Sequence, residues 1–290
     1  MLAAAACAVV LDLGVLNLGV LGLGAHDLGA LGPIRAAHAV DALPADSSAA
    51  TGYDVSHPQC GAALPADAAF AVIGVNGGRV FSDNPCLDEL TAWAYQQESS
   101  PSYYANTANP GPQLSAHWPN GQRFPRACEA EYPANDSENC SYDYGWMAAE
   151  DSYHHAYYAA LEVFGEGAAE PDGNWWLDVE TSNTWQTLQD GPTPPEQAHR
   201  NAAAALAGAV DYLTTEAQVR QVGFYSSSSQ WQQITGGTGN RFAANPVWLA
   251  GAGDRASALA RCAASESFTG GRVELAQYRE GDFDANVRCS

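Results

Sequence analysis

The chain has 290 residues, of which 33 are acidic and 12 basic, and its formal net charge is −21. Every basic residue is Arg. Nucleic-acid binding needs clustered Lys and Arg, so this composition argues against nucleic acid as a partner. The length suits one large domain or two small ones.

The N-terminal stretch, residues 1–31, is apolar and rich in Leu, Ala and Gly. It is followed by Ala37-His38-Ala39, a pattern typical of the site where an export signal is cleaved. Polar residues interrupt the stretch and it lacks a basic start, so we expect no stable membrane insertion. We predict that residues 1–39 are an export leader, with a disordered tail as the alternative. Residues 40–51 are then a linker, and residues 52–290 form a single secreted domain.

Six cysteines remain when Cys7 of the leader is set aside. An even number in an exported chain is typical of disulfides, and the spacings are too wide and too poor in His for a zinc site. Six cysteines allow several connectivities, and the sequence alone does not choose among them. As a working hypothesis we pair neighbours: Cys60 with Cys86, Cys128 with Cys140, and Cys262 with Cys289.

The first part of the domain alternates short apolar runs with a helical pattern. Residues 52–56 predict a short strand that ends in a polar turn, and residues 68–74 predict a strand buried on both faces. Residues 83–97 predict a helix, because their apolar side chains share one face. Residues 102–105 predict a third strand.

A long segment, residues 110–140, is rich in Pro, Asn, Gly and acids. It is too long for an ordinary connection, so we expect either a functional segment or an insertion pinned by a disulfide. After it, residues 142–164 predict an aromatic-rich helix and residues 175–180 a strand.

The rest of the chain continues the alternation of strands and helices. The expected elements are a helix at 194–217, a strand at 221–226, a helical turn at 230–234, a strand at 246–250, a helix at 255–263, and strands at 273–278 and 283–287. Such alternation favours a parallel sheet. About eight short strands in one domain predict an α/β fold closed as a β/α barrel. An open doubly wound sheet is the alternative, although no Gly-rich phosphate loop follows the first strand.

Two carboxylates, Asp178 and Glu180, lie at the end of the strand predicted at 175–180. Side chains two residues apart on a strand share a face, so these two project on the same side, about 6.6 Å apart along the backbone. Like charges this close do not both ionise freely, and the acid nearer apolar surface should have the higher pKa. One carboxyl could then donate a proton while the other stays anionic, which is the pattern of glycoside hydrolysis. Two solvated acids at a strand end are the alternative.

In a β/α barrel the C-terminal ends of the strands line one mouth. Acids, aromatics and an amide are expected there: Asp54, Tyr104, Asp178, Glu180, Tyr225, Trp248, Gln277 and Asp284. Carboxylates bond sugar hydroxyls and aromatic faces pack on sugar rings, so this set predicts a sugar site. Trp176 shares the face of Asp178, one step deeper, and is counted with the substrate-binding residues. No nucleophile-elbow, metal or nucleotide motif is present, so we expect no metal and no cofactor.

Six short motifs occur in order between residues 52 and 288. They are Gly52-Tyr53-Asp54-Val55-Ser56-His57, Leu177-Asp178-Val179-Glu180, Gly223-Phe224-Tyr225-Ser226, Val247-Trp248-Leu249-Ala250, Ala276-Gln277-Tyr278 and Asp284-Ala285-Asn286. Together they resemble glycoside hydrolase family 25, the lysozyme-like muramidases of bacteria and their phages. This chain would be a divergent secreted member of that family.

The resemblance implies an irregular barrel with fewer helices between its last strands. It also implies cleavage of the β-1,4 bond between N-acetylmuramic acid and N-acetylglucosamine in peptidoglycan. Glu180 would be the proton donor, and Asp178 the anionic partner that stabilises the transition state or orients the acetamido group. Asp54 would complete the acidic floor. The groove would be lined by Tyr104, Tyr225, Trp248, Gln277 and Asp284. We expect a monomer that binds this glycan.

The chain departs from that family around the mouth of the barrel. Residues 72–78 replace a Lys-Ala-Ser/Thr-Glu-Gly type stretch, and residues 103–106 replace a Tyr-His-Phe pattern. The segment that holds Cys128 and Cys140 is extra. Two alternatives therefore stay open. One is a barrel of the same fold that binds a glycan without cutting it, or with altered specificity. The other is a secreted structural protein whose acids only provide solubility.

Overall fold

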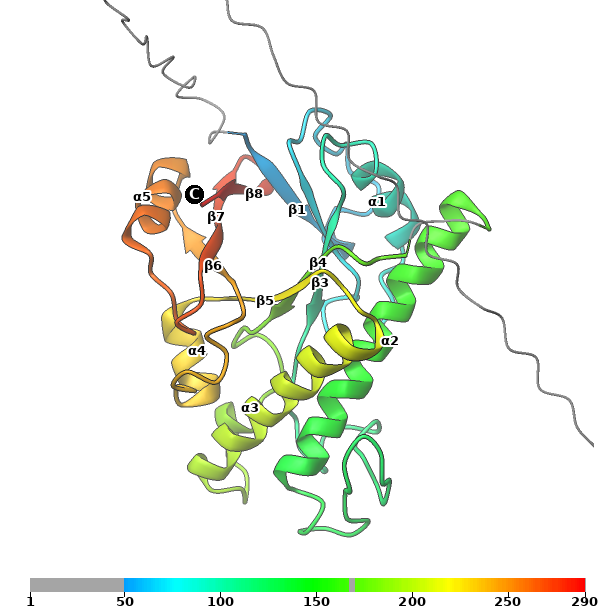
Figure 1. Cartoon of the computed structure of the whole chain (residues 1–290), viewed down its shortest axis with the longest axis vertical. Helices are drawn as coiled ribbons and strands as arrows, with labels where there is room; N and C mark the ends of the chain where they lie inside the picture. Colours follow the sequence, from blue (N-terminus) through cyan, green and yellow to red (C-terminus); the bar gives the residue numbers. More distant parts are fainter. Residues whose placement is uncertain (1–49, 167–169, 290) are drawn as a thin grey trace, which may run out of the picture. The chain divides into compact units, whose positions relative to one another are not determined.

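The computed structural model describes residues 50–166 and 170–289. The predicted leader, residues 1–39, and most of the predicted linker lie outside the described residues. Within the described part, eight strands close into one barrel in chain order (Figure 1). They are β1 (Gly52–Val55), β2 (Ala71–Gly74), β3 (Ser102–Asn106), β4 (Asn174–Asp178), β5 (Gln221–Ser226), β6 (Val247–Ala252), β7 (Val273–Glu280) and β8 (Phe283–Arg288). The predicted β/α barrel is confirmed, and the open sheet is excluded.

The strand directions make this barrel irregular. Neighbouring strands are parallel from β1 to β7, whereas β8 runs antiparallel to both β7 and β1. A tight turn joins β7 directly to β8. The barrel therefore closes through a hairpin and not through a final helical crossover. This agrees with the expectation of fewer helices between the last strands.

Five α-helices surround the described strands. They are α1 (Leu87–Ala94), α2 (Glu138–Phe164), α3 (Pro195–Asp211), α4 (Ser228–Thr235) and α5 (Arg255–Ala264), with short 3₁₀ turns at His57–Gln59 and Gln186–Leu188 and a π-helical turn at Tyr212–Glu216. In Figure 1, α2 and α3 lie side by side on one flank, and α5 lies beside β6 and β7 on the other. The predicted helix at 194–217 is thus an α-helix that continues into the π turn.

Local sequence explains the longest helix pair. The Ser137 side chain accepts a hydrogen bond from the Cys140 N–H and caps the start of α2, which satisfies one of the free N–H groups of the first turn. Further along, a Cβ added at Gly145 would lie 1.9 Å from the carbonyl oxygen of Ala205 on α3. The two helices therefore pack backbone against backbone at a point where no side chain fits.

The barrel has an interior core and an exterior one, separated by the alternation of side chains along each strand. On β4, Trp175 and Leu177 pack outward under the helices, while Trp176 packs inward. The interior cluster consists of Phe70, Val72, Trp176, Trp248 and Leu275. This small aromatic core fills the middle of the barrel and leaves room for polar side chains only at its two mouths.

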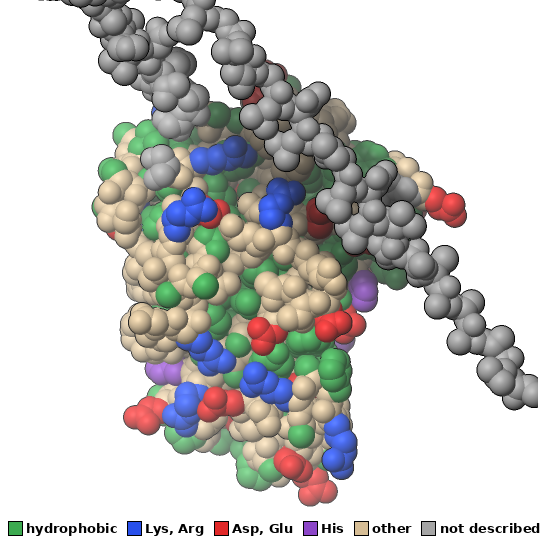
Figure 2. Space-filling view, in the orientation of Figure 1, with side chains coloured by type: hydrophobic (Ala, Val, Ile, Leu, Met, Phe, Trp, Pro, Cys, Tyr) green, Lys and Arg blue, Asp and Glu red, His purple; other side chains and the backbone are tan. Residues whose placement is uncertain are grey.

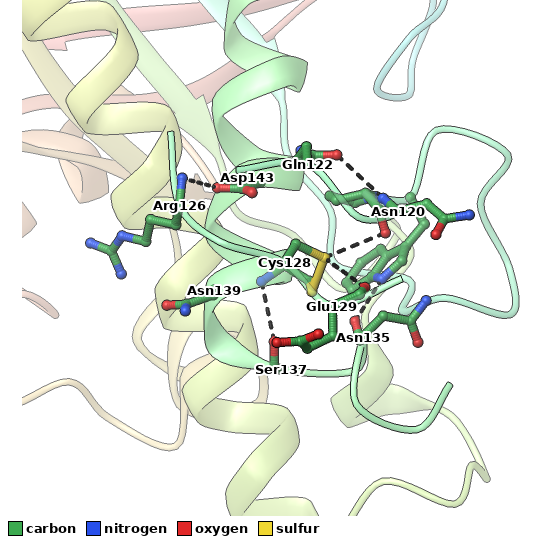
Figure 3. Close-up of a disulfide and its surroundings, with 12 residues drawn as sticks. Asn120, Gln122, Arg126, Cys128, Glu129, Asn135, Ser137, Asn139 and Asp143 are labelled. Carbon is green, nitrogen blue, oxygen red and sulfur yellow. Dashed lines mark hydrogen bonds between the residues drawn. A yellow bond between two sulfur atoms is a disulfide. The ribbon is translucent and has the colours of Figure 1, made fainter. Parts of the chain in front are cut away.

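All three proposed disulfides are present: Cys60–Cys86, Cys128–Cys140 and Cys262–Cys289. Cys128–Cys140 ties the long segment between β3 and α2 to the first turn of α2 (Figure 3). Cys262–Cys289 joins α5 to the end of the chain after β8. Of the two expectations for the long segment, an insertion pinned by a disulfide is confirmed.

The surface in Figure 2 carries basic side chains beside acidic ones, and on this face they do not gather into one basic patch. Among the helices of the described residues, none is both long and apolar enough to cross a membrane.

Candidate active site

A cavity of about 230 Å³ opens at the C-terminal ends of the parallel strands. We call it the acidic pocket. Its lining includes Asp54, Tyr104, Asp178, Glu180, Tyr225, Trp248, Gln277 and Asp284, together with Ser56, His57, Gly78, Asn106, Ser182 and Asn183. All eight residues expected at the strand exits are thus brought together. The alternative in which the acids scatter over separate surfaces is excluded.

The register of the barrel explains this convergence. Asp54 pairs with Val72 of β2 on one side and with Asp284 of β8 on the other, and Asp178 pairs with Asn106 of β3 and Tyr225 of β5. Residues far apart in the chain are therefore neighbours across the sheet. Because inward-facing positions alternate, the last inward residue of each strand points toward the same mouth.

Asp54 is buried at the floor of the acidic pocket, with 8% of its surface exposed. Its carboxyl accepts hydrogen bonds from the side-chain amides of Asn286, at 2.6 Å, and Gln277, at 3.1 and 3.2 Å. Burial raises the pKa of Asp54 to about 7, the charge of Asp284 adds to the rise, and the two amide hydrogen bonds oppose it. Burial therefore favours the protonated form of Asp54 to a higher pH than in an exposed Asp.

Asp178 is buried as well, at 5% exposure. Its Oδ2 accepts a hydrogen bond of 2.6 Å from Asn106 Nδ2, whereas its Oδ1 is buried and has no hydrogen-bond partner in the described structure. Burial, reinforced by the charge of Glu180, raises the pKa of Asp178 well above its usual range. The pair formed by Asp178 and Glu180 therefore keeps a proton to higher pH than an isolated carboxyl would.

Glu180 lies two residues beyond Asp178, after the end of β4, and is partly exposed. Gln230 of α4 donates a hydrogen bond of 3.2 Å from Nε2 to Glu180 Oε1. The same Gln230 accepts a hydrogen bond of 2.6 Å from the backbone N–H of Thr181. One amide side chain thus fixes both the Glu180 carboxyl and the backbone that carries it.

The expectation that crowding and burial raise the pKa of one of the two acids agrees with the structure, and the acid concerned is Asp178. The resemblance cast Asp178 as the anionic partner of Glu180. In the pocket as it stands this role is not the resting one, because burial favours the protonated form of Asp178. The assignment of Glu180 as proton donor remains a prediction.

Aromatic side chains continue the wall of the acidic pocket on β5 and β6, next to Asp178. The Tyr225 hydroxyl donates to Gln277 Oε1 at 2.7 Å, which connects it through the Gln277 amide to Asp54. Trp248 packs against the Tyr225 ring with centroids 4.5 Å apart, and its indole N–H donates to Asn286 Oδ1 at 2.7 Å. At 1% exposure, Trp248 offers little ring face to a ligand. It mainly holds Asn286 against Asp54.

Trp176 does not reach the acidic pocket. It is 1% exposed and packs in the interior core, where its ring lies 5.8 Å from that of Trp248. It lines a different cavity at the opposite mouth, together with Arg272 and Arg288. The substrate-binding role predicted for Trp176 is therefore wrong in its placement. Each strand runs from one mouth of the barrel to the other. On the five-residue strand β4, Trp176 lies two residues before Asp178, which is the last inward-facing residue.

Three residues that position the acids were missed in the sequence: Asn106, Gln230 and Asn286. Asn106 lies two residues after Tyr104, so strand alternation could have placed it at the mouth. Asn286 lies two residues after Asp284 for the same reason. Gln230 comes from a helix after β5, and no local pattern marks it.

Within the described residues, no group of three or more His, Cys, Asp or Glu side chains is arranged to hold a metal ion.

A scan against protein-family models and a search of curated proteins find no match to this chain. Three solved structures are similar to it. The bacterial lysozyme from Streptomyces coelicolor is 17% identical, with a TM-score of 0.47, and the alignment covers 84% of this chain and 94% of the lysozyme. The catalytic domain of endolysin ply40 from bacteriophage P40 of Listeria monocytogenes is 15% identical, with a TM-score of 0.40, covering 83% and 93%.

The third structure is the modular autolysin LytC from Streptococcus pneumoniae in complex with a synthetic peptidoglycan ligand. It is 10% identical, with a TM-score of 0.40, and the alignment covers 82% of this chain and 46% of the autolysin. The three proteins are named as a lysozyme, an endolysin and an autolysin.

Proposed function

We propose that this protein is a secreted glycoside hydrolase that cleaves the β-1,4 bond between N-acetylmuramic acid and N-acetylglucosamine in peptidoglycan. One observation carries the proposal: Asp54, Asp178 and Glu180, from distant parts of the chain, line one cavity with amide and aromatic side chains. A buried carboxyl with a raised pKa next to an accessible one is the arrangement that acid catalysis of glycoside cleavage uses.

Glu180 delivers the proton in this proposal. It is the more accessible member of the pair, and Gln230 holds its carboxyl in place. The proton that the pair retains goes to the glycosidic oxygen, the bond from that oxygen to the sugar C1 breaks, and the leaving sugar departs as an alcohol. General acid catalysis of this kind is worth roughly 10²–10⁴ in rate.

The pair holds one proton, which passes from Asp178 to Glu180 as the substrate binds. Glu180 then gives it to the glycosidic oxygen, and Asp178 is left as the anion. Its charge then faces the positive charge that develops at C1, which is the moment when an anion stabilises the transition state. Its Oδ1 is buried and has no partner in the described structure, so the 2-acetamido group of the sugar reaches it only if neighbouring side chains move. Water finally adds its hydroxyl to C1, and its proton returns to the carboxylate pair.

Asp54 organises the floor rather than the proton transfer. It holds the Gln277 and Asn286 amides, and through Gln277 it orients the Tyr225 hydroxyl toward the cavity. This network fixes polar groups that can bond sugar hydroxyls before the substrate arrives, so less ordering is required on binding.

Secretion is part of the proposal. Three disulfides in one domain fit an oxidising, extracellular environment. The predicted leader at residues 1–39 supplies the route.

The test uses purified cell walls and measures released reducing ends, with fragments identified by mass. Wild type should release disaccharide units with muramic acid at the reducing end, and Glu180→Gln should lose at least 100-fold in rate. Glu162→Gln is the matched control, because Glu162 is exposed on α2, away from the acidic pocket. Equal rates for wild type and Glu180→Gln would refute the proposal.

The second candidate is a barrel that binds the glycan without cutting it. The end of β2 favours it, since Asn76 is buried there and its amide is occupied by Ser152 and by the Asn106 N–H. That strand therefore adds no catalytic group to the mouth. Binding of wild type to walls with no release of reducing ends would select this candidate.

A further inference from the structure

A second cavity, of about 670 Å³, adjoins the acidic pocket. We call it the side pocket. The two cavities share Gly78, Ser182 and Asn183 in their walls, so they are immediate neighbours. The rest of the side pocket is lined by residues 79–81, by Thr107, Ala108 and Pro110, by residues 114–117, by Tyr144 and by Thr184.

One wall of the side pocket is the loop between β2 and α1. An isolated bridge between Asn76 and Asp83 closes the base of this loop, and the Gly77 N–H bonds the Ser82 carbonyl at 3.2 Å. Phe81 holds a positive φ of 54°, a conformation that a bulky side chain adopts only when its surroundings enforce it. Here the Phe81 ring stacks on His117 of the opposite wall, with centroids 4.2 Å apart and planes at 7°.

The opposite wall is the insertion, and it is anchored independently. The Cys128–Cys140 disulfide ties it to α2, and the Arg126 N–H donates to the buried Asp143 carboxyl at 2.9 Å (Figure 3). The Trp118 indole N–H donates to the Asn135 carbonyl at 2.9 Å. Contacts within each wall, together with the Phe81–His117 stack between them, therefore form the side pocket before any ligand binds.

The two cavities differ in charge. The acidic pocket is lined by Asp54, Asp178, Glu180 and Asp284, whereas the described residues that line the side pocket include no Asp or Glu. In a chain with a net charge of −21, the side pocket presents Arg79 and His117. Within the described structure, the exposed Arg79 guanidinium makes no ion pair or hydrogen bond. Its charge is therefore available to an anionic ligand group.

Gly78 belongs to the wall that the two cavities share. Gly78 has a φ of 84°, and a Cβ added there would lie 2.8 Å from the His57 ring, which lines the acidic pocket. A side chain at residue 78 would strain the backbone and crowd His57. Glycine at this position therefore keeps side-chain bulk out of the wall that the two cavities share.

We propose that the side pocket binds the peptide substituent of the amino sugar held in the acidic pocket, with Arg79 on a peptide carboxylate. This rests on the proposed function, because it assumes that a peptidoglycan sugar occupies the acidic pocket. In peptidoglycan the muramic acid carries a short peptide with free carboxylates beside the cleaved bond. A neutral sugar followed at once by an anionic substituent matches the order of charges across the two cavities.

The test compares two forms of one polymer: walls with their peptides, and the same glycan strands after an amidase has removed the peptides. Arg79→Gln should raise KM on the peptide-bearing form roughly 3- to 10-fold, as expected for one charge-assisted contact at a partly exposed site. Its kcat, and both constants on the peptide-free strands, should stay as in wild type. Arg79→Lys should recover part of the loss. Arg123→Gln, an exposed Arg of the insertion outside both cavities, is the matched control.

The quantity to compare is the ratio of KM on peptide-bearing walls to KM on peptide-free strands. If this ratio is the same for wild type and Arg79→Gln, the proposal is overturned. If neither polymer is cut, the hydrolase function fails, and binding still decides the inference. Calorimetry with a purified disaccharide-peptide, and with the same disaccharide lacking the peptide, should then show a preference for the peptide form. Arg79→Gln should lose that preference, and a wild type without it would refute the role of the side pocket.

Discussion

The two mouths of the barrel hold cavities of nearly equal size, about 230 and 240 Å³, and opposite chemistry. We call the cavity at the N-terminal strand ends the lower pocket. There the Arg272 guanidinium pairs with Glu274, the Gln221 amide also bonds Glu274 at 2.7 Å, and the Arg288 guanidinium lies 4.5 Å from the Phe70 ring centre. Each charge of the lower pocket has a partner within the described structure.

At the upper mouth, by contrast, Asp54, Asp178 and Glu180 make no ion pair with any described residue, and their hydrogen bonds come from neutral amides. An ionised carboxyl buried without a cationic partner is costly, which is why burial raises the pKa of Asp54 and Asp178. Acids perturbed in this way are typical of functional sites. We infer that the charged residues of the lower mouth contribute to stability and that those of the upper mouth contribute to reactivity. In β/α barrels generally, the active site lies at the C-terminal mouth.

The largest effect should come from the upper mouth. Glu180→Gln should reduce kcat on purified walls about 10²- to 10⁴-fold, because the amide has no proton to donate. Its free energy of unfolding should change by less than about 0.5 kcal/mol, since the partly exposed carboxyl makes one side-chain hydrogen bond. Rate assays and urea denaturation measure the two quantities. A large loss of stability with little loss of rate would mean that Glu180 serves stability and not catalysis.

Asp54 should make stability depend on pH. Its folded pKa, about 7, lies above its unfolded value of 3.8, so the native state binds more protons between these pH values. The free energy of unfolding should therefore fall as pH rises from 4 to 7, by roughly 1–3 kcal/mol for this group. Asn at this position cannot ionise, so the fall should be smaller in Asp54→Asn. Urea denaturation across this range checks it, and parallel pH profiles for the two proteins would contradict the assignment.

Trp176→Phe tests whether Trp176 packs in the interior core or binds substrate. The smaller ring leaves a cavity in the interior core, and the expected loss is about 1–3 kcal/mol in the free energy of unfolding. The value of kcat/KM should stay within about 2-fold of wild type, because Trp176 does not line the acidic pocket. A selective rise in KM at unchanged stability would restore its predicted role in substrate binding.

Glu274→Gln should have the smallest effect. It removes the ion pair with Arg272 at the lower mouth, and such partly exposed pairs contribute about 0.2–1 kcal/mol. Hydrolysis should be unaffected. Thermal denaturation and the wall assay, run beside Glu180→Gln, give a direct comparison of one carboxylate at each mouth. A rate loss in Glu274→Gln would mean that the lower pocket takes part in function.

Much of the fold could be predicted because its signals are local. The helices and strands follow from apolar periodicity, and most boundaries differ from the structure by a few residues. The largest differences are at β2 and α1, where the predicted strand at 68–74 and the predicted helix at 83–97 are shorter in the structure. At β2 an apolar run begins before the hydrogen-bonded strand, and at α1 the predicted helix included flanking polar residues, so the pattern does not locate the ends of either element.

The candidate site was predicted less completely. The C-terminal ends of the strands can be located in the sequence. Strand alternation then predicts most of the residues that line the upper mouth. The side pocket could not be found in this way, because its walls come from the β2–α1 loop and the insertion. These segments have no shared periodicity, and only the tertiary structure places Arg79 beside the acidic pocket.

The sequence by itself indicated that Asp178 and Glu180 share a strand face, and it favoured a closed barrel and the pairing of neighbouring cysteines, both of which the structure then established. Each depends on alternation, element order or short separation along the chain. Only the tertiary structure decided that Asp178 is the buried acid, that Asn106 and Gln230 hold the pair, and that Trp176 faces the other mouth. Burial and hydrogen bonding depend on what surrounds a side chain from every direction, and a strand pattern specifies only one of those directions.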